Sequence, residues 1–345
     1  MDYTQSVERT VQNGEPGYFW LENARKFSRM NGVEDNKDIK INGGNPCLEQ
    51  SLESYEICNL IECFPAKHES LEDFIITLKY AYLYAKTVTL CNTHWPDTNR
   101  VMLRNRRIGC SMSGIAQFIR KNGINELKKW CEVGYNAIQE YDKIYSDWLA
   151  IPLSIKISSV KPSGSVSLLN GSTPGVHYPE SRFYIRRMRL SNHSVLLDGL
   201  KNAGYNIEPC KGSEDSTVVV EFPIDIGENI RTLDKVSMWE QLALVAFMQK
   251  YWSDNQVSAT VTFTEKEAEQ IKAALDYYQY QLKGISFLPR LKNKVYPQMP
   301  YEEIDEKTYQ KMINKIGNLK FGKVANEQAE MEKFCNNDTC ELKTK

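Results

Sequence analysis

The chain has 345 residues, of which 41% are hydrophobic and 25% are charged, and its formal net charge is −1 at pH 7. This length allows one large domain or two ordinary ones, and the charge excludes a general attraction to nucleic acid or membrane surfaces. Nine cysteines without a C-x-x-C pair argue against a disulfide scaffold and against a metal site made by side chains. We expect a cytoplasmic protein, because there is no long apolar run and no signal-peptide pattern.

The predicted elements alternate between helices and strands. The first helix begins at Ser70, where Ser70-Leu71-Glu72-Asp73 forms a capping-box pattern, and a longer helix covers residues 124–149. Further strands are expected at 182–190, 218–222, 257–263 and 284–288, and further helices at 236–252, 264–282 and 302–315. This alternation indicates an α/β architecture. From residue 322 the sequence is polar and weakly periodic, which is typical of a flexible tail.

The first candidate site is Asn45-Pro46-Cys47-Leu48-Glu49, followed by Cys58. In extended backbone, alternate side chains point the same way. The spacing therefore predicts that the amide of Asn45, the thiol of Cys47 and the carboxylate of Glu49 line one cavity, an arrangement suited to redox or radical chemistry. The alternative is a buried structural cysteine near a loop.

Two other segments complete the set. Small residues around Ser163, Gly164 and Ser165 allow backbone N–H groups and hydroxyls to approach an anion, although an ordinary serine–glycine turn is the alternative. No P-loop motif is present. Cys335 and Cys340 lie in the polar tail and could form a disulfide that reaches another site, unless they are incidental. An active-site cysteine, an anion loop and a mobile dithiol are what a reductase of a phosphorylated substrate needs.

These motifs resemble those of ribonucleotide reductases, above all the monomeric, adenosylcobalamin-dependent (class II) ribonucleoside-triphosphate reductases. The resemblance rests on residues 45–49 with Cys58, on 161–187, on the terminal C-x-x-x-x-C, and on the blocks at 105–115 and 255–263. It implies a ten-stranded α/β barrel with a central finger loop. This chain would supply the C-terminal half of the barrel over residues 1–321 and a redox tail over 322–345.

The resemblance also implies the roles of individual residues in the radical reduction of ribonucleotides, expected to be triphosphates, to 2′-deoxyribonucleotides. Cys47 would become a thiyl radical after homolysis of the Co–C bond of adenosylcobalamin, and would abstract the 3′ hydrogen of the ribose. Glu49 would take the 3′-hydroxyl proton as general base, and Asn45 would hold the substrate hydroxyls. Cys58 would belong to the reducing dithiol. The remaining implied roles are phosphate binding by Ser163, Gly164 and Ser165, and re-reduction of the active-site disulfide by Cys335 and Cys340.

In the family several hundred residues precede the radical cysteine, whereas here it is residue 47. The resemblance therefore implies a second chain that carries the N-terminal half and the thiol partner of Cys58, for which Cys63 is the nearby alternative. Thioredoxin or a similar protein is the expected reductant. Two alternatives remain open: a class I large-subunit fragment that receives its radical from a partner through Tyr277 and Tyr278, and a non-catalytic nucleotide-binding remnant.

Overall fold

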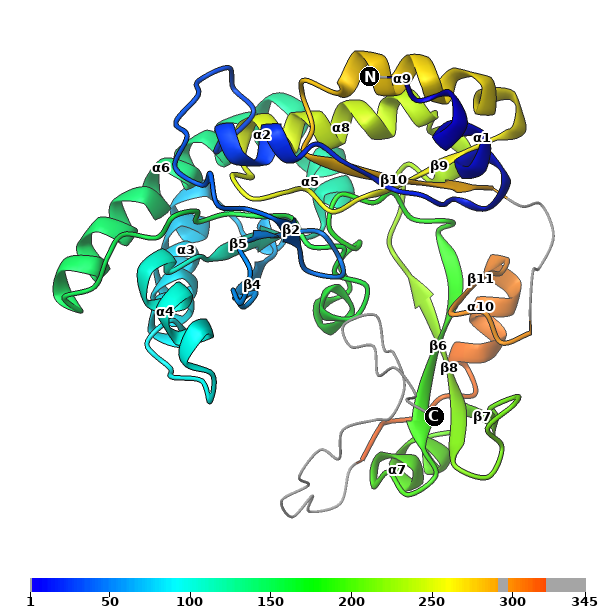
Figure 1. Cartoon of the computed structure of the whole chain (residues 1–345). Helices are drawn as coiled ribbons and strands as arrows, with labels where there is room; N and C mark the ends of the chain where they lie inside the picture. The colour runs from blue at the N-terminus through cyan, green and yellow to red at the C-terminus, as the bar shows by residue number, and fades with distance from the viewer. Residues whose placement is uncertain (1, 291–296, 321–345) are drawn as a thin grey trace. The chain divides into compact units, whose positions relative to one another are not determined.

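The computed structural model of the protein describes residues 2–290 and 297–320 (Figure 1). These residues form two compact units, one made of 2–178 and 233–290, the other of 179–232 and 297–320. The segment predicted as part of a barrel, residues 1–321, spans both units. The predicted tail over 322–345, with Cys335 and Cys340, lies outside the described residues. No helix in the described ranges is long and apolar enough to cross a membrane.

The first unit contains most of the helices and all the parallel strand pairs. Its helices are α1 (Thr4–Asn13), α2 (Leu21–Lys26), α3 (Leu71–Val88), α4 (Pro96–Asn105), α5 (Ile115–Asn122), α6 (Ile124–Trp148), α8 (Met238–Tyr251) and α9 (Ile271–Tyr278). Its strands are β1 (Tyr18–Phe19), β2 (Gly43–Gly44), β3 (Ser51–Leu52), β4 (Leu60–Cys63), β5 (Gly109–Met112), β9 (Thr260–Phe263) and β10 (Gly284–Pro289). Short 3₁₀ turns occupy Pro65–Lys67, Val166–Asn170, Leu233–Lys235 and Glu265–Gln270.

Helices begin where the sequence provides a cap. The Ser70 side chain accepts a hydrogen bond from the backbone N–H of Asp73 at 3.2 Å, which satisfies one free donor of α3. Thr264 and Glu267 form a capping box at the start of the helix predicted over 264–282, although the turn it opens is a 3₁₀ helix that continues into α9 rather than one long α-helix. The helices predicted at 124–149 and 236–252 are confirmed as α6 and α8.

The core of this unit forms where α3 packs against α6. Phe74 and Leu78 of α3 are fully buried, and the Phe74 ring stacks on Trp130 of α6 with 5.3 Å between centroids. Gly134 makes room for this contact, since a Cβ there would lie 3.0 Å from the Leu78 side chain. Burial of each such side chain contributes about 1.5–3 kcal/mol. The aromatic residues of α6 that face the core thus have a packing role.

Parallel strand segments run along one side of this core. β4 pairs with β5, and β9 with β10, in parallel. Isolated parallel bridges join Cys110 to Ser158 and Val160 to Val257, so residues 157–160 connect the two pairs. β1 adds an antiparallel strand at the β10 edge. The predicted α/β class is therefore confirmed, while no closed barrel forms within the described residues.

The second unit is an antiparallel sheet in the order β11-β6-β8-β7. Its strands are β6 (Phe183–Ser191), β7 (Asn206–Pro209), β8 (Thr217–Asp225) and β11 (Tyr301–Glu303), and its helices are α7 (Leu196–Asn202) and α10 (Glu306–Ile313). The strands predicted at 182–190 and 218–222 are confirmed. Arg187, from the basic cluster of β6, pairs with Glu221 at 2.7 Å and with Glu302 at 2.5 Å. The charge of Arg187 is thus neutralised by carboxylates of the same sheet.

Candidate active site

Residues 43–52 form a tight hairpin whose tip carries the candidate residues. β2 and β3 pair antiparallel, with Gly44 opposite Ser51. At the tip, the N–H of Leu48 donates to the carbonyl of Asn45 at 2.8 Å, and Leu48 has a φ of +56°. The prediction that 45, 47 and 49 alternate along extended backbone is therefore wrong, because the chain must reverse within a few residues and forms a turn to do so.

The turn nevertheless brings the predicted amide and carboxylate together. Asn45 Nδ2 donates to Glu49 Oε2 at 2.7 Å, while Asn45 Oδ1 accepts the backbone N–H of Gln50 at 3.0 Å. Glu49 is 3% exposed. Both ends of the Asn45 amide are thus engaged, and this fixes the orientation of the Glu49 carboxylate.

The hairpin tip is held by backbone contacts to the parallel strand segments. The hydroxyl of Ser258 donates to the Cys47 carbonyl, and the hydroxyl of Ser159 donates to the Glu49 carbonyl at 2.6 Å. The Glu49 carbonyl also accepts the N–H of Gln256 at 3.1 Å. These bonds use main-chain oxygens and therefore fix the backbone of the tip without involving the side chains of Cys47 and Glu49.

Glycines in the surrounding strands make room for the hairpin. A Cβ at Gly109 would lie 2.6 Å from Gln50 Nε2 and 3.0 Å from Ser159 Cβ, and a Cβ at Gly284 would lie 2.9 Å from the Leu48 side chain. Real Cβ atoms do not approach other atoms below 3.0 Å. A side chain at Gly109 would therefore force Leu60, Gln50 or Ser159 to shift, and one at Gly284 would displace the end of the Leu48 side chain.

Cys58 lies just before β4, next to the tip. Burial raises the pKa of the Cys58 thiol, the negative charge of Glu49 raises it further, Lys161 lowers it, and Cys47 raises it. The side chains that interact here, those of Cys58, Glu49, Lys161 and Cys47, therefore lie close together. Cys47 and Cys58 are both half-buried, and no disulfide joins them. A thiol whose pKa is raised stays protonated at neutral pH, so it can give up a hydrogen.

Cys63 has a different environment. It is 2% exposed and belongs to the core cluster, where its proximity raises the pKa of the Cys110 thiol on β5. The proximity of Cys63 to Cys58 in the sequence therefore does not give it a place at the hairpin tip.

The 161–175 segment forms a compact loop. Ser163 has a φ of +57° and is 4% exposed, and its Oγ is buried without a hydrogen-bond partner. Buried hydroxyls are almost always bonded in proteins, so this orphan suits a polar ligand group. Gly164 is half-buried and Ser165 is exposed. The ends of the loop are fixed, because the N–H of Lys161 donates to Ser111 Oγ at 2.8 Å and that of Gly175 to Ser113 Oγ at 2.9 Å.

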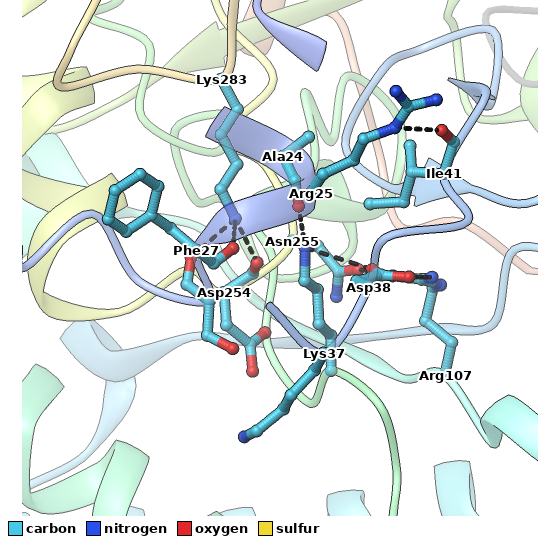
Figure 2. Close-up of polar contacts among 12 residues, drawn as sticks. Ala24, Arg25, Phe27, Lys37, Asp38, Ile41, Arg107, Asp254, Asn255 and Lys283 are labelled. Carbon is cyan, nitrogen blue, oxygen red and sulfur yellow. Dashed lines mark hydrogen bonds and ion pairs between the residues drawn. The ribbon is translucent and has the colours of Figure 1, made fainter. Parts of the chain in front are cut away.

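A buried network of charges fixes the segment that enters the hairpin (Figure 2). The Arg107 guanidinium donates to both carboxylate oxygens of Asp38, at 2.6 and 2.8 Å, and to Glu56 at 2.9 Å. Lys156 lies 3.2 Å from the same Asp38. Lys283 donates at 2.6–2.8 Å to the carbonyls of Phe27, Ser28 and Asp254.

This network ties residues 27–38 to β5, β10 and the strand segments beside them. Burial by itself would raise the pKa of Asp38, but Lys156 and Arg107 hold it below its ordinary value. Since an unpaired buried charge is very costly, each partner keeps the others in place. The entry to the hairpin is thereby rigid.

Sequence reasoning missed most of the residues that support the hairpin. Ser111, Ser113, Ser159 and Lys161 were given no role, and Glu62 was overlooked. The sequence signal that could have identified them is a pair of polar residues at alternate positions of a short apolar segment, such as Ser111 and Ser113.

The tyrosine pair of the class I alternative lies in α9. The rings of Tyr277 and Tyr278 are 4.9 Å apart, and both contact Trp239 of α8. Packing between α8 and α9 accounts for their positions. No group of His, Cys, Asp and Glu residues in the described ranges could hold a metal ion.

Comparison with known proteins identifies relatives along the whole chain. A "Probable adenosylcobalamin-dependent ribonucleoside-triphosphate reductase" from Dictyostelium discoideum is 57% identical over 349 residues, covering 99% of this chain and 46% of that protein. An adenosylcobalamin-dependent ribonucleoside-triphosphate reductase from Euglena gracilis is 56% identical over 346 residues, covering 99% of this chain and 48% of that protein. No family model matches the sequence.

The fold gives the same result. A crystal structure of a B12-dependent (class II) ribonucleotide reductase superposes with a TM-score of 0.83 at 34% identity, covering 92% of this chain and 48% of that one. The chain spans about half the length of the relatives it matches. By sequence and by fold, this chain is similar to about half of an adenosylcobalamin-dependent, class II ribonucleotide reductase.

Proposed function

We propose that this chain is the radical-bearing half of an enzyme that reduces ribonucleoside triphosphates to 2′-deoxyribonucleotides. The observation that carries the proposal is the hairpin tip. There Cys47 lies beside a carboxylate, Glu49, that is oriented by Asn45 at 2.7 Å, and beside a second, protonated thiol, Cys58. The relatives' names supply the substrate class.

Each group at the tip has a chemical task in this proposal. Cys47 gives up its hydrogen atom and, as a thiyl radical, takes the 3′ hydrogen of the ribose. Glu49 accepts the proton of the 3′-hydroxyl, and its hydrogen bond from Asn45 keeps the carboxylate aimed at that position. Cys58 and its thiol partner on the second chain together supply two hydrogens and form a disulfide, while the 2′-hydroxyl leaves as water; the protonated state of Cys58 permits this. Ser163, Gly164 and Ser165 bind the phosphates, and the orphaned Oγ of Ser163 supports this.

The cofactor in this proposal is adenosylcobalamin. The fit rests on Cys47: its side chain is half-buried at a loop tip, while its carbonyl is fixed by Ser258, so a radical generator can reach the sulfur without displacing the backbone. When bound, adenosylcobalamin supplies the homolytic chemistry that removes the thiol hydrogen atom. The protein contributes position and shielding from water.

We infer that the parallel strands are half of a ten-stranded barrel around the finger hairpin, and that a second chain carries the other half. Two observations support this. The relatives are about twice as long as this chain, and β4 pairs on one side only within the described residues. An edge strand presents unpaired N–H and C=O groups, which proteins normally pair with another strand or cover. Cys335 and Cys340 would then re-reduce the active-site disulfide and be reduced in turn by thioredoxin or a similar protein.

The test is deoxynucleotide formation by the chain co-expressed with the N-terminal half, with and without adenosylcobalamin. Cys47→Ser should abolish turnover while triphosphate binding persists, and Cys91→Ser, at an exposed cysteine, should leave both unchanged. Turnover by the Cys47→Ser variant would overturn the radical role. Turnover that needs a metal-containing radical subunit instead of cobalamin would favour the class I alternative, and binding without turnover a non-catalytic remnant.

A further inference from the structure

Glu62 of β4 is a buried carboxyl that the proposed reaction does not use. Part of the residue is exposed, but both carboxylate oxygens are inaccessible and neither forms a hydrogen bond of ordinary geometry. Strand β4 is otherwise apolar, with Leu60, Ile61 and Cys63 as its other members. A buried carboxyl without partners costs free energy, so its presence in such a strand calls for a function.

The register of the strands places Glu62 next to two serines, Ser111 and Ser113. Glu62 lies directly opposite Ser111 in the parallel β4–β5 pair, and Ser113 follows two residues later on the same face. Ser111 Oγ accepts the N–H of Lys161, and Ser113 Oγ accepts the N–H of Gly175. A hydroxyl that accepts one bond still has its own proton to donate. The buried Glu62 oxygens are the nearby acceptors without another partner.

The two serines hold the two ends of the loop that contains Ser163. Those ends are in contact, because a Cβ at Gly175 would overlap the carbonyl oxygen of Lys161. A small shift of either serine would therefore change the separation of the loop ends. This change would alter the positions of the groups between them.

We propose that Glu62 is a positioning residue that, through Ser111 and Ser113, sets the geometry of the 161–175 loop and thereby its affinity for the phosphates of the substrate. This inference rests on the proposed function of that loop. Glu62 itself touches no substrate. Its protonated form can donate to one serine and accept from the other, whereas its ionised form adds a negative charge behind an anion-binding loop.

The environment of Glu62 makes this protonation change accessible near neutral pH. The pKa of Glu62 is raised to about 7, chiefly by burial and also by the charge of Glu49, against the opposing effects of Ser113, Lys161 and Ser111. Lys161 and Glu49 are the charged groups that face it. Ionisation as the pH rises through this value introduces a negative charge, so triphosphate affinity should fall in the same direction.

The experiment measures triphosphate affinity by calorimetry on the full chain assembled with the N-terminal half, between about pH 6 and about pH 8, on either side of the pKa. For the natural protein we expect affinity to decrease with pH. Glu62→Gln keeps the shape and hydrogen bonding without the charge, so it should remove this pH dependence. Glu62→Leu should weaken binding about tenfold throughout, with the change in KM exceeding that in kcat. Glu69→Gln, the same exchange at an exposed position, should behave like the natural protein.

A nucleoside without phosphates separates this role from a general effect on the site, because its affinity should be equal in all variants. Natural affinity and pH profile in both Glu62 variants would overturn the inference while leaving the proposed function intact. If Glu62→Leu does not fold, an unchanged pH profile in Glu62→Gln is sufficient to overturn it. A natural protein that binds no triphosphate at any pH would remove the proposed function and this inference together.

Discussion

The closest fit between the hairpin and its surroundings is at Gly109, and Gly109→Ala tests it. The new Cβ would lie 2.4 Å from Leu60 Cδ2, 2.6 Å from Gln50 Nε2 and 3.0 Å from Ser159 Cβ. Gln50 cannot move away freely, because its side chain donates to the Asn59 carbonyl at 3.0 Å and accepts the Asn59 N–H at 3.3 Å. The substitution therefore either strains the core or breaks these bonds.

The expected cost follows from these contacts. Overpacking a core by one methyl group costs about 1–3 kcal/mol, and each lost hydrogen bond about 0.5–1.5 kcal/mol. The reduced entropy of the unfolded chain returns about 0.4–1 kcal/mol. We expect Gly109→Ala to lower the free energy of unfolding by about 1–3 kcal/mol. It should also reduce kcat, because Gln50 adjoins Glu49.

Gly43→Ala is the matched control, since a Cβ there meets nothing within 4 Å although Gly43 belongs to the hairpin itself. Urea unfolding followed by circular dichroism gives the free energies, and deoxynucleotide formation by the assembled enzyme gives kcat. The reasoning is refuted if the two alanine variants unfold at the same urea concentration and turn over equally.

Three further predictions concern charges and thiols. Arg107→Ala should destabilise by about 3–5 kcal/mol in urea unfolding, because it leaves buried Glu56 without its cation and Asp38 with Lys156 alone. Arg104→Ala, in a surface pair, should cost about 0–1 kcal/mol. Equal losses in the two variants would contradict the network. Burial lowers the pKa of His177 from 6.5, so the folded state resists protonation and the free energy of unfolding should fall as the pH drops below 6.5. His177→Gln should flatten this pH dependence. An unchanged dependence of stability on pH in that variant would show that His177 is not its cause. Burial and the charge of Glu49 raise the pKa of Cys58. Iodoacetamide should therefore modify Cys58 more slowly than exposed Cys91, which peptide mass spectrometry would measure. Faster modification of Cys58 would argue against its burial.

The local parts of the fold could be predicted from the sequence because their causes are local. Ser70 caps α3 through a residue three positions away, and Thr264 and Glu267 close their box over the same distance. The apolar period of α6 likewise lies within one helix. The candidate residues 45, 47, 49 and 58 were found from their types and order. Their conformation was not, because a turn held by Ser159 and Ser258 replaced the expected extended chain.

The sequence by itself determined helices α3, α6 and α8, the α/β class and the resemblance to class II ribonucleotide reductases, since these depend on short patterns and on the order of motifs. The tertiary structure alone decided how the hairpin is seated, because the groups that hold it come from residues more than 100 positions away: Ser159 and Ser258 bond to carbonyls at 49 and 47. It also decided which polar residues are buried together. Arg107 meets Asp38 69 positions away, and Glu62 meets Ser111 only through the pairing of two strands. No local pattern encodes such pairings, because they depend on how distant segments pack.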